Sequence, residues 1–272
     1  MVAGQRRDDI LPLRKSVGFG IIGIEMWRFY YVIFINLFRI PYMIRKMRHY
    51  ADHPEKYSEE KRYALARHVA RIIKRTGVIL TSVTGKENLP REGGYILYPN
   101  HQGKYDVLGI MHTHDRPLSF IIDDKASHGV LISEFTDLVQ GGRIQLEDLK
   151  QTLELFKERS ARIAAGERCI IFPEGVYAPH KKNEITDFKL VSVMLGEMAK
   201  VPIVPVVLRD SYKAFNSCYL GPVRTYVRYL KPIPYEEYAG MRTNEIAEMV
   251  RERILAAMEE MTGKKQAMPA HP

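Results

Sequence analysis

Apolar and polar positions alternate along the chain in two patterns, and each pattern predicts a different element. Short apolar runs bounded by Gly or Pro predict strands, and apolar residues that recur at intervals of three and four predict helices. The expected strands are 78–84, 95–99, 118–122, 168–172, 203–208 and 224–230. The expected helices of the same region are 106–113, 126–138, 146–165, 187–200 and 243–261. Because strands and helices take turns, the pattern predicts an α/β fold with a mixed, largely parallel sheet flanked by helices.

The most apolar segment lies in front of this region, at residues 17–40. At ~100° per residue its polar positions fall within an arc of about 80° on a helical wheel, which leaves a wide apolar face. These polar positions are Glu25, Arg28, Asn36 and Arg39. Trp27, Tyr30 and Tyr31 suit the headgroup level of a bilayer, so the segment favours a helix that lies in the membrane interface. A full membrane span and a core helix of a soluble protein are the alternatives, and Pro41 is expected to end the helix.

Two basic groups follow the apolar segment. Arg45, Lys46 and Arg48 form a cluster suited to lipid headgroups. Ser58 is a favourable N-cap for a second amphipathic helix at 59–75. The basic residues of this helix are Lys61, Arg62, Arg67, Arg71, Lys74 and Arg75, and they indicate either a solvated face or a membrane-facing patch. The expected parts of the chain are membrane-binding helices at 1–76, an α/β domain at 77–263 and a flexible tail at 264–272.

Composition and charge narrow the class of partner. The chain has 272 residues, of which 46% are hydrophobic, and a formal net charge of +9 with a pI of about 9.4. The positive charge favours anionic partners: an acidic membrane surface, phosphorylated substrates or nucleic acid. The sequence has neither zinc-finger spacing nor a Gly-rich phosphate loop. Cys169 and Cys218 offer no disulfide framework, and no cleavable signal follows the charged first residues, so a reducing compartment is expected.

One polar stretch carries the candidate chemistry. The strand at 95–99 is followed by Asn100-His101, and Asp106 opens the next helix. On one continuous helix the His and Asp side chains would point about 140° apart, so they can meet only if the chain bends, and Gly103 permits a bend. In such a pair the carboxylate fixes the tautomer of the ring, and the ring removes a proton from a hydroxyl. The alternative is a capping Asp in the first helical turn beside an unrelated surface His.

Three motifs in order resemble one known family. They are Asn100-His101 with Asp106, then Phe172-Pro-Glu-Gly175, then Val201-Pro-Ile-Val-Pro205. Over residues 78–210 this set resembles the glycerolipid acyltransferases, the 1-acylglycerol-3-phosphate acyltransferase (lysophosphatidic acid acyltransferase, PlsC-like) family. The resemblance implies a glycerolipid acyltransferase-like α/β fold and transfer of an acyl chain from acyl-CoA or acyl carrier protein to the sn-2 hydroxyl of 1-acylglycerol 3-phosphate. The product would be phosphatidic acid, and neither a metal nor a cofactor is expected.

The resemblance also implies roles for individual residues. His101 is the expected general base and Asp106 its orienting partner. Glu174 is expected to hydrogen-bond or orient the acceptor, and Gly175 to let the backbone come close. The predicted substrate-binding residues are Asn100, Lys104, Arg143, Phe172, Pro173, Glu174, Gly175 and Lys189. The implied partners are the acyl donor, a lysophospholipid acceptor and an anionic membrane surface, with the protein at the cytoplasmic face of the cell membrane as a monotopic or single-span protein.

The sequence departs from the family pattern where the phosphate of the acceptor would bind. The family continues Glu-Gly with Thr-Arg, whereas this chain has Val176-Tyr177. Lys104 and Lys189 are the favoured replacement cations, and further candidates are Arg143, His180, Lys181 and Lys182. Alternatively the acceptor is a different one, either glycerol 3-phosphate or another lysolipid.

Two other interpretations remain. A non-catalytic basic protein that binds membrane or nucleic acid would explain the charge, but the intact pair of His101 and Asp106 argues against it, and no nucleic-acid partner is expected. A zinc site at His112, His114 and Asp115 would need further ligands, so this stretch is interpreted as a polar helix end.

Overall fold

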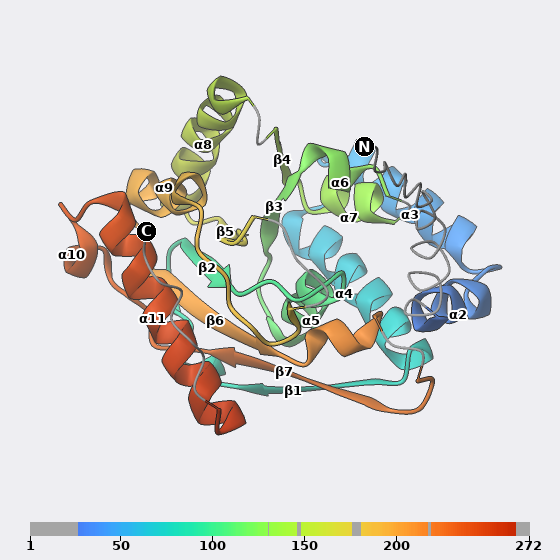
Figure 1. Ribbon diagram of the computed structural model, residues 1–272. Coiled ribbons are helices and arrows are strands. Elements are labelled where there is room, and N and C mark those ends of the chain that lie inside the picture. Colours follow the sequence, from blue (N-terminus) through green and yellow to red (C-terminus); the bar gives the residue numbers. More distant parts are fainter. Residues whose placement is uncertain (1–26, 130, 146–147, 176–180, 217–218, 265–272) are drawn as a thin grey trace, which may run out of the picture.

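The computed structural model describes residues 27–129, 131–145, 148–175, 181–216 and 219–264 (Figure 1). In this part of the chain the strands form one seven-stranded sheet with the order β1-β7-β6-β2-β5-β3-β4. The strands are β1 (Ile79–Thr84), β2 (Tyr95–Pro99), β3 (Ser119–Asp123), β4 (Gly142–Ile144), β5 (Arg168–Ile170), β6 (Ile203–Arg209) and β7 (Val223–Tyr229). Among these described strands β6 and β7 pair antiparallel and every other pair is parallel. The predicted α/β fold with a mixed, largely parallel sheet is therefore confirmed.

Helices cover both faces of the sheet. On one side lie α2 (Trp27–Ile35), α3 (Ile40–Asp52), α4 (Glu59–Thr76), α5 (Asp106–Thr113) and α7 (Ile132–Leu138), and on the other α8 (Leu149–Ala164), α9 (Leu190–Ala199) and α11 (Thr243–Thr262). Short helices α6 (Asp124–Ser127), α10 (Tyr235–Tyr238), η1 (Lys86–Asn88) and η3 (Ser211–Ala214) join these elements. In β2, Tyr95 and Leu97 pack into the first layer, whereas Ile96 and Tyr98 pack into the second. A strand covered on both faces needs such a continuous apolar run, which is why this segment could be predicted.

The predicted elements agree with the structure apart from one missed strand and a few boundaries. Strand β4, Gly142–Ile144, was not predicted. The helix expected at 126–138 divides into α6 and α7, because Leu131 takes a left-handed φ of 68° between them. The helix expected at 187–200 begins only at Leu190.

The N-terminal helix differs from its prediction at Pro41. Helix α2 ends at Ile35, and α3 begins at Ile40, so Pro41 stands in the first turn of a new helix instead of ending an old one. A first-turn residue has no helical acceptor for its N–H, and proline fits there because it lacks this donor. Residues 17–26, with Glu25, lie outside the described residues.

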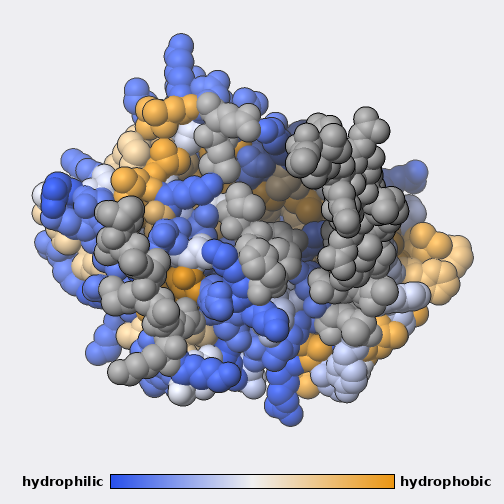
Figure 2. All heavy atoms as spheres, viewed as in Figure 1, coloured by the Kyte–Doolittle hydropathy of each residue, from blue (hydrophilic) through white to orange (hydrophobic). Residues whose placement is uncertain are grey.

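Two residues of the polar stripe, Arg28 and Asn36, face the protein, whereas Arg39 is exposed and large apolar side chains of α2 point outward. Arg28 is 1% exposed and donates to the carbonyl oxygens of Gly77 at 2.5 Å and Gly221 at 2.7 Å. Asn36, in the turn after α2, is 2% exposed and donates to Thr76 Oγ1 at 2.9 Å. The large apolar side chains exposed here are Trp27, Tyr30, Phe34, Ile35, Leu37, Phe38 and Tyr42. We call these seven residues the apolar ridge, and Figure 2 shows hydrophobic side chains at the edge of the molecule where α2 lies.

Helices α3 and α4 belong to the same core as the sheet. Met47 of α3 and Val69 of α4 are fully buried in one cluster with Tyr95 and Leu97. The packing therefore has no break at residue 76, where the sequence pattern placed a domain boundary. In the described part of the chain, no helix has the length and apolar character that crossing a membrane requires.

The basic residues of α3 and α4 divide between solvent and protein contacts. Arg48 pairs with Glu134 of α7 at 2.7 Å, and Arg67 pairs with Asp115 at 3.1 Å. Arg62, expected on the polar face, is buried instead. A membrane-facing patch on α4 thus has fewer available cations than the sequence suggests.

Candidate active site

The predicted site residues follow the carboxyl ends of neighbouring strands. Strand β2 pairs in parallel with both β5 and β6, so the residues after all three strands meet at one edge of the sheet. His101 follows β2, Glu174 follows β5, and Ser211 follows β6.

His101 and Asp106 form the predicted pair. His101 Nδ1 lies 2.7 Å from Asp106 Oδ2, and the same oxygen accepts from the backbone N–H groups of Gln102 at 2.6 Å and Gly103 at 2.9 Å. The hydroxyl of Ser211 donates to the other oxygen, Oδ1. The chain bends between the two residues as expected, but Gly103 does not adopt a positive φ there. A carboxyl group that is buried and accepts from so many donors is fixed in direction.

Two further contacts hold the imidazole of His101. Its ring stacks on the ring of Phe172 with centroids 4.1 Å apart, and its backbone N–H donates to Glu174 Oε1 at 2.8 Å. The side chain of His101 is 18% exposed, so the ring is held by the protein yet reaches the surface. The arrangement places a fixed imidazole at a site that a substrate can enter.

Glu174 is a clamp between loops. Besides His101, it accepts at Oε2 from the backbone N–H of Thr186 at 3.1 Å and from the Thr186 hydroxyl at 2.5 Å. Burial raises the pKa of Glu174, and the hydrogen bonds from Thr186 and His101 partly offset this rise. Both carboxylate oxygens thus bind protein groups, so the contact of Glu174 with an acceptor remains a prediction.

The turn of Gly175 brings Lys189 to the site. Gly175 has a φ of 78°, which favours glycine, and a Cβ atom added there would lie 2.8 Å from Lys189 Cδ, so the lysine side chain passes close to this turn. The backbone N–H of Lys189 donates to Pro173 O at 2.8 Å. Lys189 is exposed, and its side chain lies beside Gly175 in the turn that follows β5.

The remaining predicted residues have different surroundings. Asn100 is fully buried, and its side chain exchanges hydrogen bonds with the backbone of Leu208, at 2.7 and 3.0 Å. It ties β2 to β6, so it supports the position of His101 and does not face a substrate. Lys104 lies next to the pair, with its Nζ 4.9 Å from the ring centroid of Phe29 in α2, and partial burial lowers its pKa.

Arg143 does not join the other site residues. It lies on β4, the third strand from β2 and therefore ~14 Å away across the sheet. Its guanidinium pairs with Asp137 at 2.8 Å and donates to Ser127 Oγ at 3.1 Å. Arg143 is thus the weakest of the predicted phosphate-binding cations, and Val176, Tyr177 and His180 lie outside the described residues.

The sequence analysis missed the residues that hold the loop of His101 and Asp106 against segments far away in the sequence. Gln102 donates from Nε2 to Asn183 at 2.8 Å and accepts at Oε1 from the backbone N–H of Ser211 at 2.8 Å. Asn183 in turn binds Asp210. Because Asp210-Ser211 follows a predicted strand, the rule that sites collect at strand ends was the one signal that pointed to it.

The stretch considered for zinc is held by protein contacts instead. His112 lies 2.7 Å from Lys74 Nζ, His114 binds Tyr95, and Asp115 pairs with Arg67 and Lys86. Within the described ranges no three His, Cys, Asp or Glu side chains gather in a way that would hold a metal ion.

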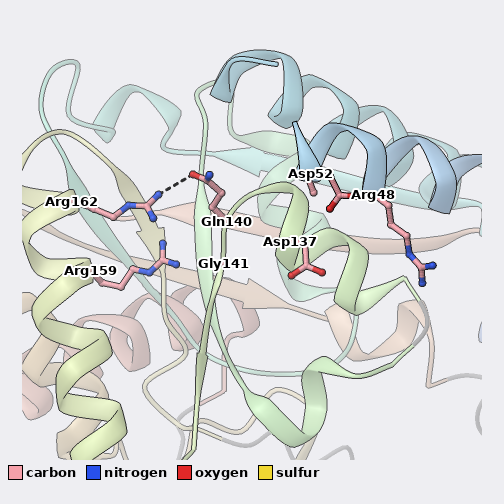
Figure 3. A pocket seen from close by; sticks show the side chains of 8 residues that line it. Arg48, Asp52, Asp137, Gln140, Gly141, Arg159 and Arg162 are labelled. Atoms are coloured by element: carbon pink, nitrogen blue, oxygen red, sulfur yellow. Dashed lines mark hydrogen bonds between the residues drawn. The ribbon is translucent and has the colours of Figure 1, made fainter. Parts of the chain in front are cut away.

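A cavity of about 380 Å³ lies at the opposite edge of the sheet (Figure 3). Its lining includes Gly141, just before β4, and Arg159 and Arg162, which extend from α8 toward it. Both guanidiniums pair with Glu167, at 3.3 and 2.5 Å. The cavity is therefore separate from the candidate active site, and its arginines have a counter-ion within the protein.

Known proteins resemble this chain in sequence and fold. A family model described as "Acyltransferase" matches residues 81–209. The 1-acyl-sn-glycerol-3-phosphate acyltransferase of Saccharomyces cerevisiae is 24% identical over 188 residues, covering 66% of this chain and 60% of that protein. The 1-acyl-sn-glycerol-3-phosphate acyltransferase alpha of Mus musculus is 25% identical over 200 residues, covering 68% and 65%. The chain thus spans less than two thirds of the length of these relatives.

A solved structure has the same fold. The crystal structure of PlsC, the 1-acyl-sn-glycerophosphate (LPA) acyltransferase of Thermotoga maritima, superposes with a TM-score of 0.68 at 17% identity. The match covers 90% of this chain and 98% of that one. The likeness extends well beyond the region of the family model and includes helices on both sides of the sheet.

Proposed function

We propose that the chain is an acyltransferase, as the family model over residues 81–209 suggests, and that it transfers an acyl chain from acyl-CoA or acyl carrier protein to the sn-2 hydroxyl of 1-acylglycerol 3-phosphate. The product is phosphatidic acid. The observation that carries the proposal is the pair of His101 and Asp106, 2.7 Å apart, beside the turn Phe172–Gly175. The names of the relatives support the choice of acceptor.

The geometry supports one direction for the proposed proton transfer. The N–H at Nδ1 of His101 donates to Asp106, so the lone pair of the ring is on Nε2. Nε2 takes the proton of the acceptor hydroxyl while its oxygen attacks the thioester carbonyl. The C–S bond then breaks, and the leaving thiolate takes the proton from the imidazolium. Asp106 stabilises the ring while it is charged, and no covalent enzyme intermediate is required.

The acceptor phosphate requires a cation near this pair. Lys189 lies over Gly175, and Lys104 lies three residues after His101. We propose that these two lysines bind the phosphate, because Arg143 is paired with Asp137 and lies on β4, three strands from β2. An ammonium group binds phosphate as a point charge, without the forked geometry of the family's arginine.

The absence of Thr-Arg after Gly175 supports a second candidate, the same chemistry on another acceptor. Two lysines that grip phosphate less specifically would tolerate glycerol 3-phosphate or another lysolipid. A panel of acceptors with one acyl donor separates the candidates, since a strong preference for 1-acylglycerol 3-phosphate would dismiss the second.

Acyl transfer by the purified chain tests the proposal. The chain in mixed micelles is given acyl-CoA or acyl carrier protein with 1-acylglycerol 3-phosphate, and phosphatidic acid is measured. His101→Ala should lower turnover by about 10²- to 10⁴-fold, the usual contribution of a general base. His68→Ala, which removes an exposed histidine of α4, is the matched control and should retain full activity. Equal activity of His101→Ala and the native chain would refute the proposal.

The apolar ridge supports a location at the membrane surface. Its side chains point away from the core, and the exposed cations Arg39 and Arg45 lie beside them. Such a surface binds a bilayer by inserting its apolar side chains among headgroups and attracting anionic lipids. Helix α2, which carries four of the ridge residues, also adjoins the site, because its Phe29 contacts Lys104. We propose that the protein docks on the cytoplasmic face of the membrane through this ridge.

Vesicle sedimentation tests the docking. The double variant Phe34→Ser/Phe38→Ser removes two exposed rings, of which Phe38 is 95% exposed, and should weaken binding to anionic vesicles by about tenfold or more. Leu149→Ser, an exposed apolar residue of α8 on the other side of the sheet, is the control. If the two variants bind vesicles equally well, the ridge is not the docking surface.

A further inference from the structure

The carboxylate of Asp106 is held by contacts from two parts of the chain. Its Oδ2 accepts from the ring of His101 and from two N–H groups of its own loop. Its Oδ1 accepts from the hydroxyl of Ser211, which lies 105 positions further along the sequence. Ser211 is buried, so water cannot easily replace its hydroxyl. In the described residues, this serine is the side chain that reaches the carboxylate from outside the loop.

The backbone around Ser211 is built to aim this hydroxyl. Asp210 adopts a left-handed φ of 61°, a conformation that a residue other than glycine rarely takes. Two contacts compensate for it: Asp210 N donates to Asn183 Oδ1 at 2.9 Å, and Ser211 N donates to Gln102 Oε1 at 2.8 Å. Strained backbone that the surrounding contacts hold in place is typical of functional sites.

We propose that Ser211 is a positioning residue of the pair of His101 and Asp106. By binding Oδ1, it sets the rotation of the carboxylate so that Oδ2 faces Nδ1 of the ring. Its second effect is electronic, because a hydrogen bond to a carboxylate lowers the negative charge available to the imidazolium. The effect on turnover rests on the proposed acyl transfer, whereas the effect on the ring does not.

Removing the hydroxyl has a predictable consequence for the ring. In Ser211→Ala the carboxylate loses one donor and attracts the protonated ring more strongly, so the ring should keep its proton to a higher pH. The other charged or titratable groups on the elements beside the ring belong to its own loop, to the turn after β5, to the start of α9 and to η3 with its flanks. They are Lys104, Glu174, Lys189, Asp210, Tyr212 and Lys213, and all remain in the variant.

Nitrogen NMR of the full chain labelled with ¹⁵N-histidine, in micelles, measures this directly. The titration midpoint of the His101 ring should move upward in Ser211→Ala, and Ser211→Thr, which keeps a hydroxyl, should resemble the native chain. Ser211→Cys, whose thiol is a weak donor, should lie between them. Ser160→Ala, which removes a buried hydroxyl of α8 bonded to Lys157 O at 2.9 Å, is the matched control and should leave the ring unchanged.

Turnover gives the second readout. Ser211→Ala should lower kcat about tenfold with little change in KM, and the acidic limb of its pH–rate profile should move to higher pH. An unchanged ring titration in a folded Ser211→Ala chain would overturn the inference. If Ser211→Ala does not fold, the titration midpoints of His101 in the other chains decide. A midpoint in Ser211→Cys above those of the native chain and Ser211→Thr supports the inference, and equal midpoints overturn it. A shifted ring titration in a chain that shows no acyl transfer would refute the proposed function and leave the positioning role intact.

Discussion

The two edges of the sheet each hold a histidine, and the partners of the two rings differ. At the carboxyl edge, His101 binds the carboxylate of Asp106 and reaches the surface. At the amino edge, His114 is fully buried, with its Nε2 2.6 Å from the hydroxyl of Tyr95 and its Nδ1 2.8 Å from Arg116 O. One ring has the side chain of an aspartate as its partner, and the other has a tyrosine hydroxyl and a backbone carbonyl.

This difference decides what each ring can do. Burial lowers the pKa of His114 to about 4, and the charges of Arg116 and Arg168 add to the effect. His114 therefore stays neutral near pH 7 and joins β2 to the end of α5 as a structural group. A ring beside a buried carboxylate can instead accept a proton during a reaction, because the positive charge it gains is already matched.

Sequence distance alone does not distinguish the two rings. Asp115 is the immediate neighbour of His114, yet its carboxylate turns to solvent and pairs with Arg67 at 3.1 Å and with Lys86. Asp106 lies five positions after His101, and the bend between strand and helix brings the two together. A His and an Asp form a pair because of the turn between them, not because they are close in sequence.

Replacing each aspartate by asparagine gives the sharpest test of this comparison. Asp106→Asn should lower acyl transfer by about 10³-fold, since the charge that stabilises the imidazolium is lost. The fold should survive, because the Ser211 hydroxyl can accept from an amide as readily as it donates to a carboxylate. Asp115→Asn breaks two ion pairs on a carboxylate that is 62% exposed and should change turnover less than twofold.

The assay is acyl transfer at one pH near 7, with circular dichroism of each variant as a check of folding. If Asp106→Asn and Asp115→Asn lose similar amounts of activity, the carboxylate of Asp106 has no special role in the reaction. If only Asp106→Asn loses activity, the negative charge beside His101 is what the reaction requires.

The sequence predicted most of the sheet because its strands are either fully buried or clearly alternating. It missed β4 because Gly142–Ile144 is three residues long, too short for any periodicity to be visible. It placed Arg28 on a polar stripe but could not tell that this side chain faces inward, since that depends on the backbone carbonyls of Gly77 and Gly221.

The candidate site was predictable where its contacts are local. His101 and Asp106 are close in sequence, and the motif Phe172–Gly175 is recognisable by composition. The contacts of Glu174 with Thr186 and of Ser211 with Asp106 depend on how β5 and β6 lie beside β2. The hydrophobic pattern of the sequence does not show how β5 and β6 align beside β2, so these contacts could be identified only from the structure.

A smaller effect than the loss of turnover in Asp106→Asn is expected from His114, the neutral ring at the amino edge. It concerns the free energy of unfolding at acidic pH. The pKa of His114 is about 4 in the folded chain against 6.5 ordinarily, so between these values the unfolded chain binds more protons. Stability therefore falls as the pH drops from 6.5 to 4, by about 3 kcal/mol from this group when the drop is complete. His112, whose pKa burial and Lys74 also lower to about 4, acts in the same direction.

Urea unfolding at pH 7 and at pH 4.5 measures this loss. In His114→Asn the loss of unfolding free energy between the two pH values should be smaller than in the native chain by roughly 2–3 kcal/mol. This difference does not depend on how much the substitution destabilises the fold at pH 7. His112→Asn should reduce the loss as well, and His68→Asn, at an exposed position, should leave it unchanged. If His114→Asn loses as much stability in acid as the native chain, the ring at the amino edge is protonated in the fold, and the contrast between the two edges fails.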